Sequence, residues 1–236
     1  MKQSRYTFSE NEKKHEVRKM FDSIARSYDF LNHLLSFGID YYWRKKAIKL
    51  TGLNSNTVLL DVACGTGDFA IEAKKHGVKK IYGADFSFNM LSIFDKKAEW
   101  IRGKEFQTAA EHMPVKPASV TNITVAFGVR NFYDIPLAFR EFSRVLTPGG
   151  KATILEFRMP TNPLIKLVYR FYFKVILPLV GKIFSGHSSA YNYLPDSVEE
   201  FDRNVDLKKI FLESGFSKVD VHSLTFGTVQ VVIARV

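Results

Sequence analysis

Cysteine is nearly missing from this chain of 236 residues, in which Cys64 is the only one. A single cysteine excludes a disulfide within the chain and fits a reducing compartment such as the cytosol. The six histidines are scattered between His15 and His222, without the spacing of metal ligands. We therefore expect no metal, and we interpret Cys64 as a packing residue rather than a nucleophile.

The sequence also lacks internal repeats and low-complexity tracts, and segment 1–10 has no apolar core of a secretory signal. We therefore expect a cytoplasmic protein. Acidic residues are few relative to basic ones, because 24 Asp and Glu stand against 34 Lys and Arg, a formal net charge of +10. This excess favours a polyanionic partner, either nucleic acid or an anionic membrane surface.

The pattern of apolar runs predicts an α/β fold in a single domain spanning 1–236. Strands are expected near 57–62, 80–85, 121–127 and 151–156, with helices near 68–76, 88–98 and 134–146 between them. This alternation is typical of a parallel sheet with helices on both faces. A helix end and a turn are expected at 145–150. Two β-rich runs at 217–225 and 228–236 predict a terminal antiparallel hairpin.

The most informative segment is the run from Val58 to Ala70, where an apolar strand meets a glycine-rich turn and then a helix start. Gly65 and Gly67 allow the backbone to approach a ligand, and the N–H groups that open the next helix favour ligand oxygens or carboxylates. Asp85 follows the second strand and is suited to accept hydrogen bonds from a ribose diol. The segment therefore predicts a nucleoside-binding site.

Asp61 decides between two cofactors that fit this loop. The spacing of Gly65, Gly67 and Ala70 also satisfies a dinucleotide fingerprint, so NAD and FAD are alternatives, as is a glycine turn that binds nothing. A carboxylate at Asp61 would repel a pyrophosphate, whereas it suits the cationic amino-acid half of S-adenosylmethionine. We favour S-adenosylmethionine.

Two segments outside the sheet pattern stand out. The segment of about 10–50 has helical periodicity, and we expect it to cap the cofactor cleft. Tyr28, Asp29 and Asn32 are its polar groups that could point into this cleft. The segment 163–184, within an insertion of about 160–200, combines many apolar residues with Lys166, Arg170 and Lys174 at every fourth position. It predicts either a helix that lies in a membrane surface or a packed helix whose lysines face water.

Several motifs make the chain resemble the C-methyltransferases of quinone biosynthesis, which act on demethylmenaquinol or on the polyprenyl benzoquinol precursor of ubiquinone. The resemblance covers nearly the whole length. The matching segments are 21–29, 61–68, 83–87, 127–131 (Phe-Gly-Val-Arg-Asn), 144–150, 155–157 and 191–197 (Tyr-Asn-Tyr-Leu-Pro-Asp-Ser). The cofactor loop is common to many methyltransferases, whereas the motifs at 127–131 and 191–197 together are specific.

The resemblance implies a Rossmann-like class I methyltransferase fold, with a seven-stranded, mostly parallel sheet and an antiparallel terminal strand. It places S-adenosylmethionine across the carboxyl ends of the strands. The cofactor-binding residues that we expect are Asp61, Gly65, Thr66, Gly67, Asp85, Ala109, Ala110 and Phe127. Relatives carry a polar residue where this chain has Ala109, so one side-chain contact to the adenine is missing and the backbone of Ala110 would have to suffice.

The resemblance also implies transfer of the sulfonium methyl to a ring carbon of a quinol. Such a carbon becomes nucleophilic when an adjacent hydroxyl ionises. Arg130 is the candidate that stabilises a phenolate or positions a water, and Asn131 is the candidate that orients this water. Tyr28 and Asp29, or Tyr193, are candidates that line the quinol side. The alternative for Arg130 and Asn131 is a strand-end salt bridge and a turn cap.

The expected substrate is a prenylated quinol, most of all demethylmenaquinol, with the polyprenyl-methoxy-benzoquinol of ubiquinone biosynthesis as the alternative. Segment 163–184 would then give peripheral membrane contact at the inner face of the cell membrane. A basic RNA-directed methyltransferase or binding module is a further alternative. Its sequence support is poor, because the densest basic and aromatic segment is dominated by Leu, Ile and Val, so we expect no nucleic acid partner. A homodimer remains open.

Overall fold

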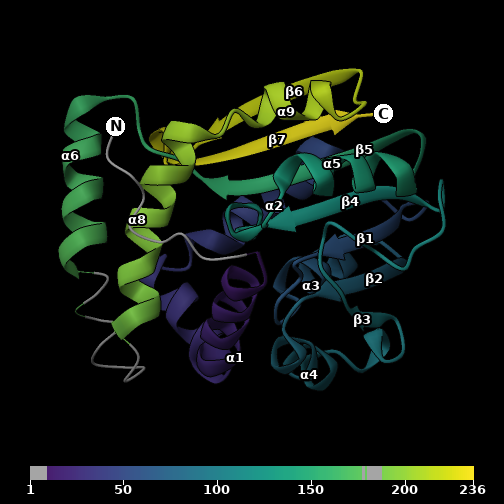
Figure 1. The fold of residues 1–236 in the computed structure, drawn as a ribbon, viewed down its shortest axis with the longest axis horizontal. Coiled ribbons are helices and arrows are strands. Elements are labelled where there is room, and N and C mark those ends of the chain that lie inside the picture. Colours follow the sequence, from purple (N-terminus) through teal and green to yellow (C-terminus); the bar gives the residue numbers. More distant parts are fainter. Residues whose placement is uncertain (1–9, 177–178, 180–187) are drawn as a thin grey trace.

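Seven strands form one sheet in the computed structural model, which describes residues 10–176, 179 and 188–236 (Figure 1). The strand order is β3-β2-β1-β4-β5-β7-β6, and β7 runs antiparallel to the other six strands. The strands are β1 (Val58–Val62), β2 (Lys80–Asp85), β3 (Glu105–Gln107), β4 (Val120–Ala126), β5 (Leu146–Phe157), β6 (Lys218–Leu224) and β7 (Val229–Arg235). The predicted fold class and the antiparallel terminal hairpin are confirmed.

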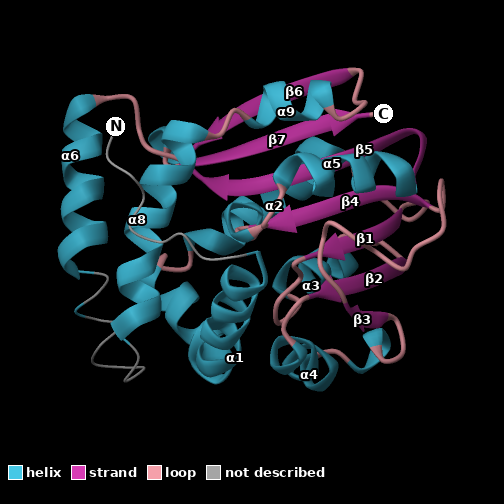
Figure 2. Ribbon diagram, viewed as in Figure 1, coloured by secondary structure: helices cyan, strands magenta, loops and turns pink. Residues whose placement is uncertain are grey.

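Helices cover both faces of this sheet, as predicted (Figure 2). They are α1 (Glu10–Leu35), α2 (Ile39–Thr51), α3 (Asp68–Lys75), α4 (Phe88–Lys97), α5 (Ile135–Val145), α6 (Pro163–Phe171), α8 (Ser188–Asn204) and α9 (Leu207–Glu213), with short turns η1 (Glu99–Ile101), η2 (Val129–Asn131), η3 (Tyr172–Ile176) and η4 (Thr225–Gly227). One core joins the sheet to α5 and α9, and another joins its other face to α2, α3 and α4.

Short polar side chains fix where the helices near the carboxyl ends of the strands begin. Ser87 accepts a hydrogen bond from the backbone N–H of Met90 at the start of α4, and Asp134 accepts one from Leu137 at the start of α5. Such N-caps satisfy backbone donors that have no partner within the helix. The helices that follow β2 and β4 therefore start close to the edge where these strands end.

The helical cap that was predicted over about 10–50 consists of two helices, α1 and α2. Phe37 and Gly38 have φ values of 51° and 73°, so the chain turns between α1 and α2. A third core, built from Ile24, Leu31, Met90 and Phe173 among others, joins α1 to α4 and to the insertion. The cap and the insertion thus pack on each other beside the sheet.

The insertion differs in detail from the sequence prediction. The helix expected over 163–184 is α-helical only to Phe171 and continues as the π-helical turn η3, and residues 177–178 and 180–187 lie outside the described part. In Figure 1, α6 and α8 stand side by side at the left. Arg170 donates a hydrogen bond to Glu199 of α8, and Lys174 Nζ lies 3.5 Å from Glu199 Oε2. Part of the predicted basic stripe therefore faces α8.

Other boundaries also depart from the prediction. The turn expected at 145–150 is part of β5, whose Leu146 pairs with Val120 before the register shifts. The three-residue strand β3 and the helix α9 were not predicted. Among the described residues, no helix has the length and apolar character needed to cross a membrane.

Candidate functional site

Two neighbouring cavities lie at the carboxyl ends of the parallel strands. The first, which we call the loop cavity, has a volume of about 110 Å³ and is formed where β1, β2 and β4 end. The second, which we call the apolar cavity, has a volume of about 270 Å³ and lies between the cap, the end of β5 and the insertion. Phe21, Tyr28 and Phe127 line both, so the cavities share a wall.

The loop cavity is lined by a carboxylate, Asp85, and by the open backbone of the turn after β1 at Gly65. Asp85 accepts hydrogen bonds from the backbone N–H of Gly65 at 2.7 Å and of Ser87 at 2.8 Å. A Cβ added at Gly65 would meet nothing within 4 Å, so a ligand has room to approach this backbone. Gly65 and Asp85 therefore lie together as the sequence predicted, and they fit a ribose of S-adenosylmethionine.

Gly67 has a different role from Gly65. Its φ is 86°, and a Cβ there would lie 2.0 Å from the Phe94 ring. Gly67 is not among the residues that line the loop cavity. It is thus required by the turn and by the packing of α4 rather than by direct ligand approach.

Asp61 is fully buried in β1 and is not among the lining residues of the loop cavity. Its Oδ1 accepts a hydrogen bond from the Thr124 hydroxyl at 2.6 Å. Burial raises the pKa of Asp61 to about 7, although Thr124 and the Arg44 cation act in the opposite direction. Burial likewise raises the pKa of Asp85 to about 6. Both pKa values therefore lie above that of an ordinary Asp, and a positive charge brought near either carboxyl would lower them.

Thr66 and Asp29 contact each other and not the cavities. The Thr66 hydroxyl donates to Asp29, and Lys97 Nζ lies 2.7 Å from Asp29 Oδ2 and 2.6 Å from Asp68 Oδ1. Burial alone would lower the pKa of Lys97, but the Asp68 and Asp29 carboxylates outweigh it and raise this pKa. These contacts tie α1 to the turn after β1. Asp29, a predicted catalytic residue, thus lies in a network that holds the loop.

Ala109 and Ala110, which the resemblance places at the adenine, also line the loop cavity. Next to them, the buried Glu111 accepts hydrogen bonds from the backbone N–H groups of Tyr133 at 2.8 Å and Asp134 at 3.2 Å. Glu111 thereby connects the segment after β3 to the segment before α5. Sequence reasoning gave Glu111 no role.

The apolar cavity has a floor of aromatic rings. The rings of Phe127 and Phe157 pack with centroids 4.6 Å apart and planes tilted by 33°, and the Trp43 ring lies 5.9 Å from the first and 6.0 Å from the second. Phe173 and Ile24 also line it. The matching motifs contain Phe127 and Phe157 but not Trp43, which meets these two rings only through the packing of α2 on β5. Such a cavity suits a flat, apolar ligand.

Arg130 lines the apolar cavity, and Asn131, the next residue, lines the loop cavity. Arg130 Nη1 donates to the backbone oxygen of Phe127 at 2.6 Å and to Glu156 Oε1 at 2.8 Å. Glu156 has no exposed surface. The strand-end salt bridge that was the alternative for Arg130 is thus present, and so is the position beside a cavity that a catalytic role requires.

Tyr28 stands at the wall shared by the two cavities. Burial raises the pKa of Tyr28, while Arg130 and a hydrogen bond with Asn32 act in the opposite direction. A neutral phenol at this place offers one donor and one acceptor to a ligand in either cavity. The structure therefore brings Tyr28, Arg130 and Asn131 together, whereas the side chain of Tyr193 lies outside the described residues.

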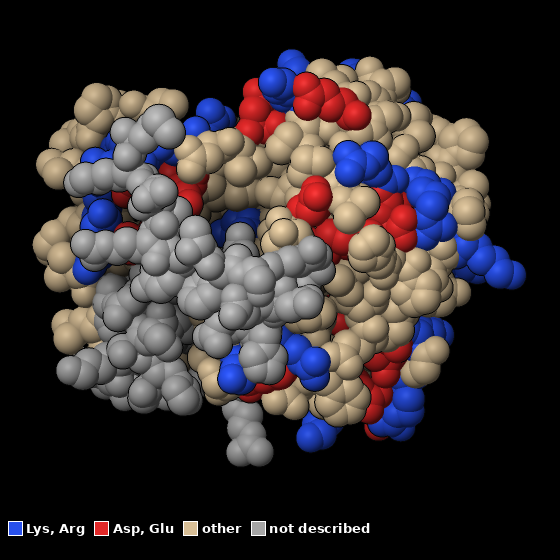
Figure 3. All heavy atoms as spheres, in the orientation of Figure 1, with Lys and Arg blue, Asp and Glu red and all other residues tan. Residues whose placement is uncertain are grey.

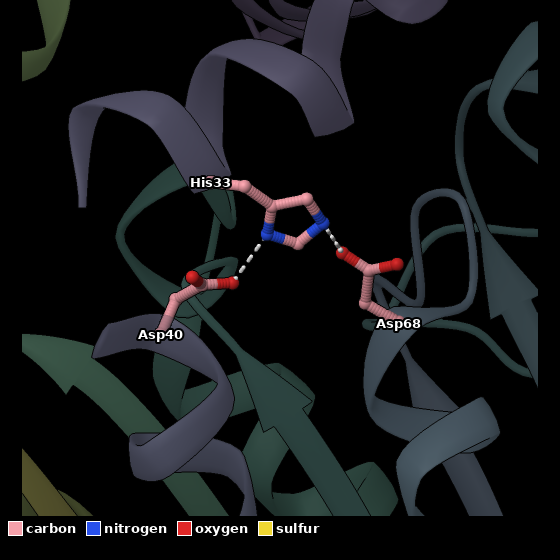
Figure 4. Close-up of side chains that lie close together, drawn as sticks. All are labelled: His33, Asp40 and Asp68. Carbon is pink, nitrogen blue, oxygen red and sulfur yellow. Dashed lines mark hydrogen bonds and ion pairs between the residues drawn. The ribbon is translucent and has the colours of Figure 1, made fainter. Parts of the chain in front are cut away.

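A cluster of charged groups from three helices lies beside this junction. The His33 imidazole is placed between two carboxylates, with Nδ1 2.8 Å from Asp40 and Nε2 3.5 Å from Asp68 (Figure 4). The three groups lie close enough to hold a metal ion. However, Arg44 pairs with both carboxylates and Lys97 with Asp68. These cations already balance the charge, so the cluster is an ion-pair network.

Charge on the surface is mixed. On the face shown in Figure 3, Lys and Arg are interspersed with Asp and Glu and do not form one continuous basic field. A nucleic-acid site would gather its cations along the path of a phosphate backbone. The described residues visible on this face form no such path.

Comparisons with known proteins agree with this geometry. A model of the ubiE/COQ5 methyltransferase family matches residues 8–235. The chain is 45% identical to a demethylmenaquinone methyltransferase of Chlorobaculum parvum, over 90% of this chain and 89% of that one. It is 43% identical to the ubiquinone/menaquinone biosynthesis C-methyltransferase UbiE of Geotalea daltonii, over 95% and 97%.

Solved structures show the same fold at low identity. A SAM-dependent methyltransferase of Thermotoga maritima, described as a possible histamine N-methyltransferase, superposes with a TM-score of 0.61 at 18% identity. The match covers 92% of this chain and 98% of that one. At this identity the likeness shows the fold alone.

Proposed function

The chain belongs to the ubiE/COQ5 methyltransferase family, and from this membership we propose that it methylates a ring carbon of demethylmenaquinol. The family, the fold and the use of S-adenosylmethionine agree with the sequence predictions. Bound S-adenosylmethionine supplies an electrophilic methyl group on a cationic sulfur. The acceptor, the site residues and the membrane contact are the parts of the proposal that experiments must test.

The observation that carries the proposed acceptor is the apolar cavity beside the loop cavity. Its aromatic floor of Trp43, Phe127 and Phe157 suits a quinol ring, and the shared wall at Tyr28 and Phe127 brings that ring next to the cofactor. Methyl transfer requires sulfur, methyl and acceptor carbon nearly in line. Positioning of this kind contributes about 7 to 11 kcal/mol to lowering such barriers.

Each polar group at the junction has a task in this proposal. Asp85 accepts from the ribose diol, and the backbone at Gly65 and Ala110 contacts the cofactor. Asp61 and Thr66 act indirectly. Asp61 holds β1 through its hydrogen bond with Thr124, and Thr66 holds α1 through its hydrogen bond with Asp29. Arg130 stabilises the ring oxygen that ionises, because its guanidinium stays charged in an apolar site. Asn131 and Tyr28 orient the water that accepts the ring proton.

The test is transfer of labelled methyl from S-adenosylmethionine to chemically reduced demethylmenaquinone and, in parallel, to the prenylated methoxy-benzoquinol. We expect label in the naphthoquinol. Label in the benzoquinol alone would show that the acceptor is the precursor of ubiquinone instead. Label in neither, with cofactor binding demonstrated and RNA methylated instead, would overturn the proposal.

Cofactor affinity is expected to rise as pH rises from about 5 to about 7.5. In the free protein, burial raises the pKa of Asp61 to about 7 and of Asp85 to about 6. A cationic cofactor favours the ionised carboxylates, so binding releases protons and tightens about tenfold per pH unit for each carboxyl that is protonated. Calorimetry in two buffers of different ionisation enthalpy measures this release.

The stability of the cofactor-free protein should change in the opposite sense. Both folded pKa values lie above that of an unfolded Asp, so these groups stabilise the fold at low pH and lose this contribution as pH rises through about 6 to 7. An Asp85→Asn variant removes one of the two titrations. If this variant released as many protons on cofactor binding as the wild type, the assignment of one of these titrations to Asp85 would be wrong.

Helix α6 is the surface that we propose for membrane contact. Leu164, Leu167 and Phe171 are 71%, 67% and 58% exposed, and α6 has no buried residue. Arg170 of α6 and Lys174 of the following turn η3 lie toward α8 and Glu199. An apolar face beside basic groups is suited to the headgroup region of an anionic membrane, which keeps the enzyme near a prenylated substrate.

A Leu167→Glu/Phe171→Glu variant is expected to bind anionic vesicles at least about tenfold more weakly, because burying one such side chain contributes about 1.5 to 3 kcal/mol. Flotation with the vesicles measures binding. Val221→Glu is the matched control, since Val221 is also exposed but lies on β6, away from α6. Equal binding by the α6 variant and the wild type would exclude this surface.

A further inference from the structure

Arg44 is a buried cation that the proposed reaction has not yet used. It lies on α2, is 6% exposed and lines the apolar cavity. Its guanidinium carbon is 5.9 Å from the centroid of the Phe127 ring, on the aromatic floor. Arg44 therefore lies beside the place that the ring of an acceptor would take in the apolar cavity.

The charged network holds Arg44 by two of its nitrogens. Nη1 donates to Asp40, and Nη2 lies 3.5 Å from Asp68 Oδ2. His33 bridges these two carboxylates, and Ser36 donates to Asp40 at 2.7 Å. Burial alone would raise the pKa of Asp40, but Ser36 and Arg44 reverse this and lower it. The guanidinium is thus fixed in position before any ligand arrives.

The third nitrogen of Arg44 is different. Nε is buried and has no hydrogen-bond partner among the residues that the structure describes. A buried donor without a partner costs about 1 to 3 kcal/mol, and more when the group is charged. Less than 1 Å² of Nε is exposed, so a ligand atom accepts from it, and removes this cost, only after a small shift of the Arg44 side chain. Most of the other residues that line the apolar cavity are apolar or aromatic.

We propose that Arg44 Nε donates a hydrogen bond to a ring hydroxyl oxygen of the quinol and favours its ionised form. The inference rests on the proposed function and adds a second guanidinium to the acceptor site. Arg44 and Arg130 both line the apolar cavity. The charge of each acts to lower the pKa of Tyr28, which lines the same cavity. A para-quinol has two ring oxygens, so two cationic donors can serve one acceptor.

The variant that tests this inference is Arg44→Lys. Lysine keeps a cation for Asp40 and Asp68, so the fold and the affinity for S-adenosylmethionine are expected to stay near wild type, whereas the Nε donor is lost. We expect kcat/KM for the quinol to fall about 10- to 100-fold, as for loss of a hydrogen bond to a charged group. Lys45→Met, an exposed neighbour on α2, is the matched control.

The decisive readout is ionisation of a bound probe, a prenylated 2-hydroxy-1,4-naphthoquinone whose visible absorbance changes when its hydroxyl ionises. Wild type and Lys45→Met are expected to lower the pKa of the bound probe by more than about one unit, and Arg44→Lys by clearly less. A merely structural role would leave this pKa unchanged.

The outcomes separate the inference from the proposed function. An equal pKa of the probe in Arg44→Lys and wild type, with methyl transfer to the quinol intact in both, would overturn the role of Arg44 alone. Failure of the wild type to bind the probe or to methylate either quinol would overturn both proposals.

Discussion

Replacing Arg130 with methionine is expected to destabilise the fold by about 3 to 5 kcal/mol and to lower kcat/KM for the quinol at least about 100-fold. The stability loss arises because Glu156 has no exposed surface and pairs with Arg130 at 2.8 Å. Removing one partner of such a pair leaves a buried charge without compensation. The activity loss follows if the guanidinium stabilises the ionised ring oxygen, a contribution of about 10²- to 10³-fold for one donor.

The two effects separate in a double variant, Arg130→Met with Glu156→Gln. A glutamine is neutral and its amide oxygen still accepts from the backbone N–H of Phe157, which donates to Glu156 at 2.9 Å. Stability is therefore expected to return to within about 1 to 2 kcal/mol of wild type, while activity stays low. Urea unfolding and labelled methyl transfer measure these quantities. Recovery of activity together with stability would show that Arg130 acts only as the salt bridge.

Most of the sheet could be predicted because its strands are long, buried apolar runs punctuated by turns. The runs at 80–85 and 121–127 match β2 and β4 to within one residue. The three residues of β3 carry no such pattern, and they become a strand only because β2 offers an edge for Glu105, Phe106 and Gln107 to pair with. The turn expected at 145–150 is extended for a similar reason, since Leu146 pairs with Val120.

Site residues could be predicted where a short stretch of sequence identifies them. Residues that reach the site only through the packing of distant elements could not. Gly65 and Asp85 are twenty residues apart, yet the parallel strand ends bring them within hydrogen-bond distance. Asp29 and Thr66 were expected to face ligands, but they lie in contact with each other. Arg44 gave no signal, because its burial and its place in the cavity depend on how α2 packs on β5.

Substituting alanine for Gly67 is expected to destabilise the fold by about 2 to 5 kcal/mol. The φ of 86° costs an L-residue about 1 to 2 kcal/mol. In addition, the new Cβ would lie 2.0 Å from the Phe94 ring, which is fully buried and also approaches Gly83, where a Cβ would lie 3.0 Å away. Held between these two glycines, the ring cannot move aside, and overpacking of this kind costs about 1 to 3 kcal/mol.

Two further variants identify the cause of the Gly67→Ala effect. Adding Phe94→Leu makes room for the methyl group, so the double variant should be more stable than the sum of the single effects predicts. Gly65→Ala shares the positive φ but meets open space, so it should lose only about 1 to 2 kcal/mol while its methyl group enters the loop cavity and weakens S-adenosylmethionine binding. Thermal unfolding and cofactor titration measure both quantities. Additive losses for Gly67→Ala and Phe94→Leu would exclude the clash, and equal cofactor affinity in Gly65→Ala and wild type would exclude close backbone approach at this turn.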